Sequence, residues 1–114
     1  METIERYRTI IHRLLSEYQE FYRRGTQTEV DTEIVADDTH GQYMVMRVGW
    51  RGETRVRRPL FYLRLKENKI WIEGDWTKDG IASELMAEGV CREDIVLAFH
   101  APNLQREEHE QKAA

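Results

Sequence analysis

The sequence predicts an α+β fold: a long N-terminal helix packed on an antiparallel β-meander, followed by a short helix and a final strand-like segment. Three observations predict it. Apolar residues recur at helical spacing near the N-terminus, they alternate along several later runs, and short turns separate those runs. With 114 residues the chain has the size of one domain, so we expect a single domain over residues 1–114. Past Pro102 the sequence becomes polar, and we expect 103–114 to be a frayed tail.

Residues 3–24 form the predicted first helix. Its apolar residues fall alternately three and four positions apart, which places them on one face, and three more widen that face into a core-packing stripe. The first set is Ile4, Tyr7, Ile11, Leu14, Tyr18 and Phe21, and the second is Ile10, Leu15 and Tyr22. Gly25 follows two arginines and is the expected end of the helix.

Four strands are predicted over residues 28–35, 43–50, 56–66 and 69–73. Only Glu67 and Asn68 separate the last two, which indicates a tight hairpin in which Asn68 takes a positive φ. We expect the helix to cover the face that carries Met44, Met46, Val48, Trp50, Phe61, Leu63, Leu65, Ile70 and Ile72. The opposite face then carries Tyr43, Val45, Arg47, Leu60, Tyr62, Arg64, Trp71 and Glu73.

That opposite face is too aromatic and aliphatic for an ordinary solvated surface, so we expect it to be an interaction surface. A second copy of the chain is the expected cover for this face or for a sheet edge, which predicts a homo-oligomer. After the meander, Thr77 is the expected N-cap of a helix over residues 78–88 that ends at Gly89. Residues 94–99 are predicted to form a short buried strand or an extended segment.

Charge is unevenly distributed along the chain. The net charge is -4, but residues 47–69 carry eight basic residues against Glu53 and Glu67, a local net charge of +6. One interpretation is a patch that orients an acidic partner, and the other is a set of solvated strand residues. Because basic and aromatic residues interleave here, a platform for single-stranded nucleic acid is a third possibility.

The composition excludes several classes of protein. No stretch approaches the length of a membrane span, and the N-terminus does not resemble a secretory signal, so we expect a cytoplasmic protein without membrane contact. The single cysteine, Cys91, excludes an internal disulfide and a cysteine-based zinc cluster. We expect no metal and no cofactor, because the four histidines are scattered and the common catalytic motifs are absent from the sequence.

Two positions support an enzymatic alternative. Asp75 lies in an acidic group with Glu73 and Asp79 ahead of the predicted second helix, and His100 follows an apolar run at a predicted strand end. Acids before a helix ordinarily complement its dipole, and such a histidine is ordinarily bonded to nearby backbone. A small enzyme with a pocket near Asp75 and His100 is therefore the least favoured hypothesis, and we expect no catalysis.

The chain also resembles a known family. The matching blocks are Gly49-Trp50, Lys69-Ile70-Trp71-Ile72, Asp75, Thr77, Ile81-Ala82, Glu84-Leu85, Gly89-Val90 and Asp94-Ile95-Val96-Leu97-Ala98-Phe99-His100 with Pro102, together with Tyr7-Arg8, Leu14-Leu15 and Tyr18. These blocks are similar to the XisI family, named for the fdxN element excision controlling factor of cyanobacteria. The resemblance implies a controlling role in excision of a DNA element by a site-specific recombinase, alongside a XisH-like protein partner.

Our first hypothesis is accordingly a non-enzymatic accessory factor that acts through a XisH-like partner in element excision or site-specific recombination. The alternative is a direct nucleic-acid-binding module that uses the basic residues from Arg47 to Lys69, for which DNA contact is possible but not favoured. The candidate partner-binding residues are Arg47, Arg58, Tyr62, Arg64, Trp71, Glu73, Asp75 and His100.

Overall fold

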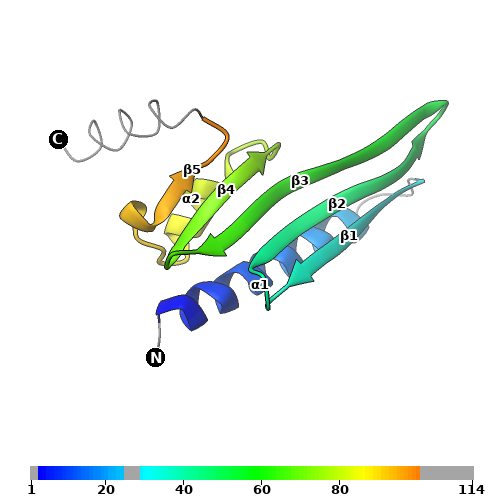
Figure 1. Ribbon diagram of the computed structural model, residues 1–114. Coiled ribbons are helices and arrows are strands. Elements are labelled where there is room, and N and C mark those ends of the chain that lie inside the picture. The colour runs from blue at the N-terminus through cyan, green and yellow to red at the C-terminus, as the bar shows by residue number, and fades with distance from the viewer. Residues whose placement is uncertain (1–2, 25–28, 101–114) are drawn as a thin grey trace.

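The computed structural model describes residues 3–24 and 29–100, and its elements follow the predicted order (Figure 1). Helix α1 covers Thr3–Arg24 and is followed by strands β1 (Val30–Asp37), β2 (Gln42–Arg51), β3 (Thr54–Lys66) and β4 (Lys69–Asp75). Helix α2 (Ile81–Ala87), a 3₁₀ turn (Arg92–Asp94) and strand β5 (Ile95–Leu97) complete the fold. The α+β prediction is confirmed. The expected helix stop at Gly25 and the expected tail lie outside the described residues.

The five strands form one sheet in the order β1-β2-β3-β4-β5. The first three pairings are antiparallel, as the meander prediction requires, whereas β5 pairs parallel to β4. The parallel pair arises because the chain crosses over through α2 before it returns to the sheet. Glu67 and Asn68 both have positive φ, 55° and 60°, which gives the predicted tight turn between β3 and β4.

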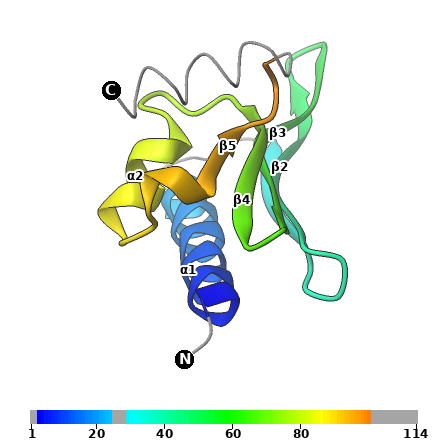
Figure 2. The same cartoon turned by 60° about the vertical axis from the view of Figure 1, so that its left-hand side comes forward.

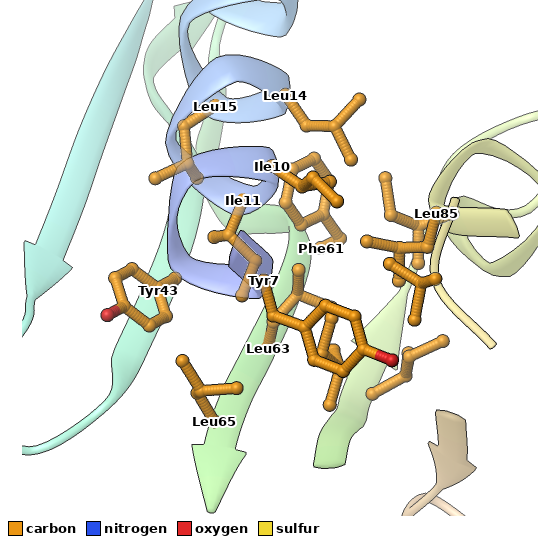
Figure 3. Packing of buried hydrophobic residues seen from close by; sticks show 14 of the residues in the cluster. Tyr7, Ile10, Ile11, Leu14, Leu15, Tyr43, Phe61, Leu63, Leu65 and Leu85 are labelled. Atoms are coloured by element: carbon orange, nitrogen blue, oxygen red, sulfur yellow. The ribbon is translucent and has the colours of Figure 1, made fainter. Parts of the chain in front are cut away.

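Both helices pack on the same face of the sheet, and the core lies between them and the strands (Figure 2). Figure 3 shows Ile10 and Leu14 of α1 turned toward Phe61 of β3 and Leu85 of α2. Ile11, Phe61, Leu63 and Ile72 are fully buried and Leu14 nearly so, as predicted.

The predicted face of β2 was wrong. Tyr43 and Val45 are fully buried against α1, whereas Met46 is only half-buried on the other face and Trp50 is 48% exposed. Both faces of β2 are apolar, so alternation by itself does not say which one turns inward. The hydroxyl of Tyr43 donates a 2.8 Å hydrogen bond to Asp38 at the margin of the core, and this partner lets a polar aromatic side chain take the inner position.

A bulge explains a second difference. The pairing of β2 with β3 shifts between Val45 and Met46, which leaves Leu60 as an extra residue of β3. Leu60, expected on the outer face, is therefore 5% exposed in the core beside Phe61.

Phe21 of α1 also departs from its predicted place. It is 71% exposed, while Tyr22 packs inward against the guanidinium of Arg47.

Helix α2 begins at Ile81, three residues later than predicted, and Thr77 does not cap it. The carboxylate of Asp75 takes that role: Oδ2 accepts the backbone N–H of Ile81 at 2.8 Å, and Oδ1 accepts the N–H and hydroxyl of Thr77 at 3.0 and 2.5 Å. The helix ends at Ala87, and Gly89 is the stop signal after it, as predicted. Gly89 has φ 105°, and hydrogen bonds from Gly89 N to Met86 O and from Val90 N to Leu85 O form a Schellman motif.

Candidate functional site

The face of the sheet turned away from both helices, here called the open face, brings together four of the predicted partner-binding residues. Tyr62, Arg64, Trp71 and Glu73 lie on it, in neighbouring positions of β3 and β4. The strand register aligns Gln42, Arg64 and Trp71 in one row across β2, β3 and β4. All of these side chains are half-buried, so each one keeps a surface that a partner can contact.

The polar side chains of the open face are held by one another. Arg64 Nη1 lies 3.5 Å from Glu73 Oε2, and the hydroxyl of Tyr62 donates a hydrogen bond to Gln42 Oε1. The ammonium of Lys66 sits 4.2 Å from the centroid of the Trp71 ring. Because these contacts limit side-chain freedom before binding, a partner would meet a partly ordered surface.

An apolar strip continues this surface along β2. Met44, Met46 and Val48 are half-buried there, and Val35 of β1, opposite Met44, is 46% exposed. These are the β2 side chains that the sequence analysis placed in the core. The prediction of an apolar, aromatic outer face is therefore correct in kind, but β2 contributes methionines and valine instead of Tyr43 and Val45.

Arg47 and Arg58 lie on the other face of the sheet, where they oppose each other in β2 and β3. Arg47 is 7% exposed, donates a 2.6 Å hydrogen bond to Thr32 Oγ1 and stacks 4.7 Å from the Tyr22 ring centroid. Burial lowers the pKa of Arg47, and the nearby positive charges of Arg51 and Arg58 lower it further. Arg47 thus belongs to the packing beneath α1, whereas Arg58 is exposed.

The basic stretch from Arg47 to Lys69 is not one patch. Arg64, Lys66 and Lys69 lie at the turn between β3 and β4 and in the strands beside it, while a second group lies at the far end of the β2–β3 hairpin. That second group is Arg51, Arg55, Arg57 and Arg58, all exposed. The prediction of a single basic surface was therefore wrong, because the two groups lie at opposite ends of β3.

Asp75 is the last residue of β4, and His100 follows the end of the adjacent parallel strand β5, so the fold places them at the same end of the sheet. Both oxygens of the Asp75 carboxylate accept hydrogen bonds from the turn that leads into α2. The His100 ring is half-buried and packs edge-on against Phe99 at 4.6 Å between centroids. Asp75 thus orders the turn that leads into α2, a structural role expected of an acid before a helix.

Two histidines pair with aspartates at the turn between β1 and β2, a contact that was not predicted from the sequence. His12 Nε2 of α1 lies 2.7 Å from Asp38 Oδ1, and His40 Nδ1 lies 2.8 Å from Asp37 Oδ2. The hydrogen bonds from His12 and Tyr43 hold the pKa of Asp38 below its usual range. Consecutive aspartates in a turn were the only available signal, because the approach of His12 depends on how α1 packs.

Within residues 3–24 and 29–100, no group of three or more histidine, cysteine, aspartate or glutamate side chains has the arrangement that a metal ion needs. Over the same residues, no helix has the length and apolar character of a membrane span. Cys91 is an exposed free thiol.

Fold and surface together define a small α+β domain with two helices on one face of a mixed sheet and an aromatic, methionine-rich open face. A family profile described as XisI protein matches residues 1–110, so the chain belongs to the XisI family. Comparison with curated proteins finds no match.

Two solved structures from Anabaena variabilis are similar to this chain. A XisI-like protein is 31% identical with a TM-score of 0.82, over 91% of this chain and 94% of its own. The fdxN element excision controlling factor XisI is also 31% identical, with a TM-score of 0.75 over 90% of this chain and 97% of its own.

Proposed function

We propose that this protein is a non-enzymatic accessory factor that controls the excision of a DNA element by binding a protein partner with its open face. The observation that carries the proposal is the group of Tyr62, Arg64 and Trp71 beside half-buried methionines, on the face opposite both helices. The similar Anabaena structure described as an excision controlling factor supports the link to element excision. The XisH-like partner is the one that the family resemblance implies.

The chemistry of the open face suits a protein better than a nucleic acid. Tyrosine, tryptophan and arginine are enriched where protein interfaces concentrate their binding energy, and methionine adapts its shape to a partner. Glu73 neutralises Arg64 at 3.5 Å, and a carboxylate in the middle of the surface would repel phosphates. A protein surface that offers its own paired charges can satisfy both side chains.

An accessory role without catalysis is supported by how the acidic residues are used. Asp75 caps α2 through both carboxylate oxygens, and Glu73 pairs with Arg64. Glu84, the acid of α2, accepts a hydrogen bond from the hydroxyl of Tyr18. Each of these acids has a structural partner, so the proposal assigns control of excision to binding.

The decisive experiment mixes the purified protein with a purified XisH-like protein and measures the complex by calorimetry and light scattering. Trp71→Ala should weaken binding by about thirtyfold, the effect of losing an interface residue worth about 2 kcal/mol. Phe21→Ala is the matched control, because Phe21 is an exposed aromatic residue on α1. Equal affinities of wild type and Trp71→Ala, or equal losses in both variants, would contradict an open-face site.

Exchanging the charges of Arg64 and Glu73 tests the same surface independently. The double variant R64E/E73R keeps the internal ion pair but reverses its direction across the open face. We expect folding to be preserved and partner affinity to fall about tenfold, since an opposed charge pattern costs binding energy. An unchanged affinity would show that the partner does not read this ion pair.

The predicted homo-oligomer can be measured on the same samples. If a second copy covers the open face, sedimentation of the wild type should show a dimer that Trp71→Ala converts to a monomer. A XisH-like partner would then have to displace that copy, and its binding would weaken as the concentration of this protein rises. A monomer at all accessible concentrations would contradict self-association.

A further inference from the structure

The β2–β3 hairpin extends past its neighbouring strands and forms an arm, defined here as residues 48–58 (Figure 1). The pairing of β1 with β2 ends at Val30 and Gly49 and is followed by a hydrogen bond from Trp50 N to Glu29 O, so residues 51–55 reach beyond β1. The pairing of β3 with β4 begins at Phe61, and residues 54–60 therefore precede it. The arm is a ribbon whose tip, residues 51–55, is two-stranded, and whose base keeps β1 as a third strand beside Val48 and Gly49.

Cationic side chains line this ribbon. It carries four arginines against a single acid, Glu53, and all four arginines are exposed. Trp50 is 48% exposed near the tip, with the guanidinium of Arg55 lying 5.3 Å from its ring centroid. A chain with a net charge of -4 thus concentrates positive charge on one thin projection.

The arginines point to both sides of the ribbon. Residues paired across antiparallel strands share a face, so Arg55 and Arg57 lie on the side of their partners Trp50 and Val48. Arg58 opposes Arg47, and Arg51 opposes Thr54, on the other side. A flat acidic surface could engage only one of these sides. A groove with phosphates along both walls could engage them together.

We propose that the arm binds double-stranded DNA by entering a groove, with its arginines reaching the phosphates on both sides. Paired strands lie about 4.8 Å apart, and the major groove of B-DNA is about 12 Å wide, which admits the two-stranded tip of the arm. This inference goes beyond the proposed open-face partner, because it places the factor on the DNA itself through a different part of the molecule.

Binding of the purified full chain to a labelled, mixed-sequence duplex can be followed by fluorescence anisotropy at several salt concentrations. We expect a dissociation constant on the order of 10⁻⁵ M and a slope of log affinity against log salt of about -3 to -4, since up to four arginines would displace counterions. R57E/R58E should weaken binding at least about tenfold and reduce the steepness of that slope by about 2.

The matched control is K78E/R92E, which changes the net charge equally at two exposed positions outside the arm. It should bind DNA like the wild type, and R57Q/R58Q replaces the glutamate variant if the latter fails a circular dichroism test of folding. Equal losses in arm and control variants would overturn the proposal, as would absence of duplex binding at low salt.

Two further measurements test the kind of ligand. Poly-glutamate serves as a protein-like polyanion, and equal competition by it and by unlabelled duplex would overturn groove binding. Tighter binding to single strands that Trp50→Ala abolishes would replace the proposal with a stacking platform. Partner binding through the open face is measured without DNA, so this proposal and the proposed function fail independently.

Discussion

Tyr7 joins the first helix to the C-terminal part of the chain through one hydroxyl group. Its ring is fully buried, and its hydroxyl donates a 2.5 Å hydrogen bond to Asp94 Oδ2, 87 residues away in the sequence. Burial, followed by the hydrogen bond to Asp94, raises the pKa of Tyr7 to about 12. The hydroxyl therefore stays protonated under all ordinary conditions and acts as a permanent donor.

Tyr7→Phe keeps the packing of the ring but removes this donor. We expect the free energy of unfolding to fall by about 1 to 3 kcal/mol, because the Asp94 carboxylate loses its partner in a partly buried place. Urea denaturation measures the change. Tyr62→Phe on the open face is the control and should cost less than about 0.5 kcal/mol, as surface substitutions usually do. Equal costs would contradict a special role for Tyr7.

The aspartates of the β1–β2 turn predict an acid-sensitive stability. Hydrogen bonds from His40 lower the pKa of Asp37, and hydrogen bonds from His12 and Tyr43 lower that of Asp38. Their contribution is fully present above the unfolded pKa of about 3.9 and is lost as pH falls toward the lowered folded values. Urea midpoints should therefore decline from about pH 5 downward. Asp38→Asn should make that decline shallower, and an unchanged profile would count against the Asp38 contacts.

At the scale of elements, the helix and the hairpins could be predicted because their signals are local. The spacing of Tyr7, Ile11 and Leu14 defines one helix face, and Asn68 provides the positive φ of a tight turn. The inner face of β2 could not be predicted, because Tyr43 and Met46 belong to faces of similar apolarity. The bulge at Leu60 left no clear mark in the sequence. Acids were expected at the start of α2, but the sequence did not show that Asp75 and not Thr77 would cap it.

Because the two faces of the sheet are buried to different degrees, truncating their side chains should lower the free energy of unfolding by different amounts. Leu63 is fully buried in β3, so Leu63→Ala should lower the free energy of unfolding by about 2 to 5 kcal/mol through the cavity it leaves. Met46→Ala should cost about 1 kcal/mol or less, since Met46 is half-buried on the open face. Urea denaturation of both variants measures the difference. A larger loss of unfolding free energy for Met46→Ala than for Leu63→Ala would contradict the placement of Met46 on the open face.

At the scale of the whole molecule, α1 is tied to the C-terminal half at several levels along its length. Arg6 Nη1 donates to Gly89 O at 3.2 Å, Arg13 pairs with Glu88 at 2.6 Å, and Tyr18 bonds Glu84. The candidate site could be predicted only in part for the same reason. Tyr62, Arg64, Trp71 and Glu73 meet because they are near neighbours in one hairpin, whereas the place of Arg47 depends on where α1 lies.

These long-range contacts predict that the domain unfolds as one unit. Tryptophan fluorescence reports Trp50 and Trp71 in the sheet and Trp76 in the segment before α2. It should lose its native signal at the same urea concentration as far-UV circular dichroism, which is dominated by α1. Equal midpoints and slopes are the expected result. Separate transitions would show that α2 and β5 fold independently of the first helix.

The side chains of β3 are buried to different degrees along the strand, and this affects which substitutions the strand can accept. Residues 61–65 alternate between the packed core and the open face, whereas residues 54–58 of the same strand are exposed or half-buried. In a library of all single substitutions selected only for folding, positions 54–58 should accept most amino acids and Phe61, Leu63 and Leu65 few. A second selection for function should restore constraint on the arm. The amino acids accepted along this one strand would thus be limited by stability at residues 61–65 and by recognition at residues 54–58.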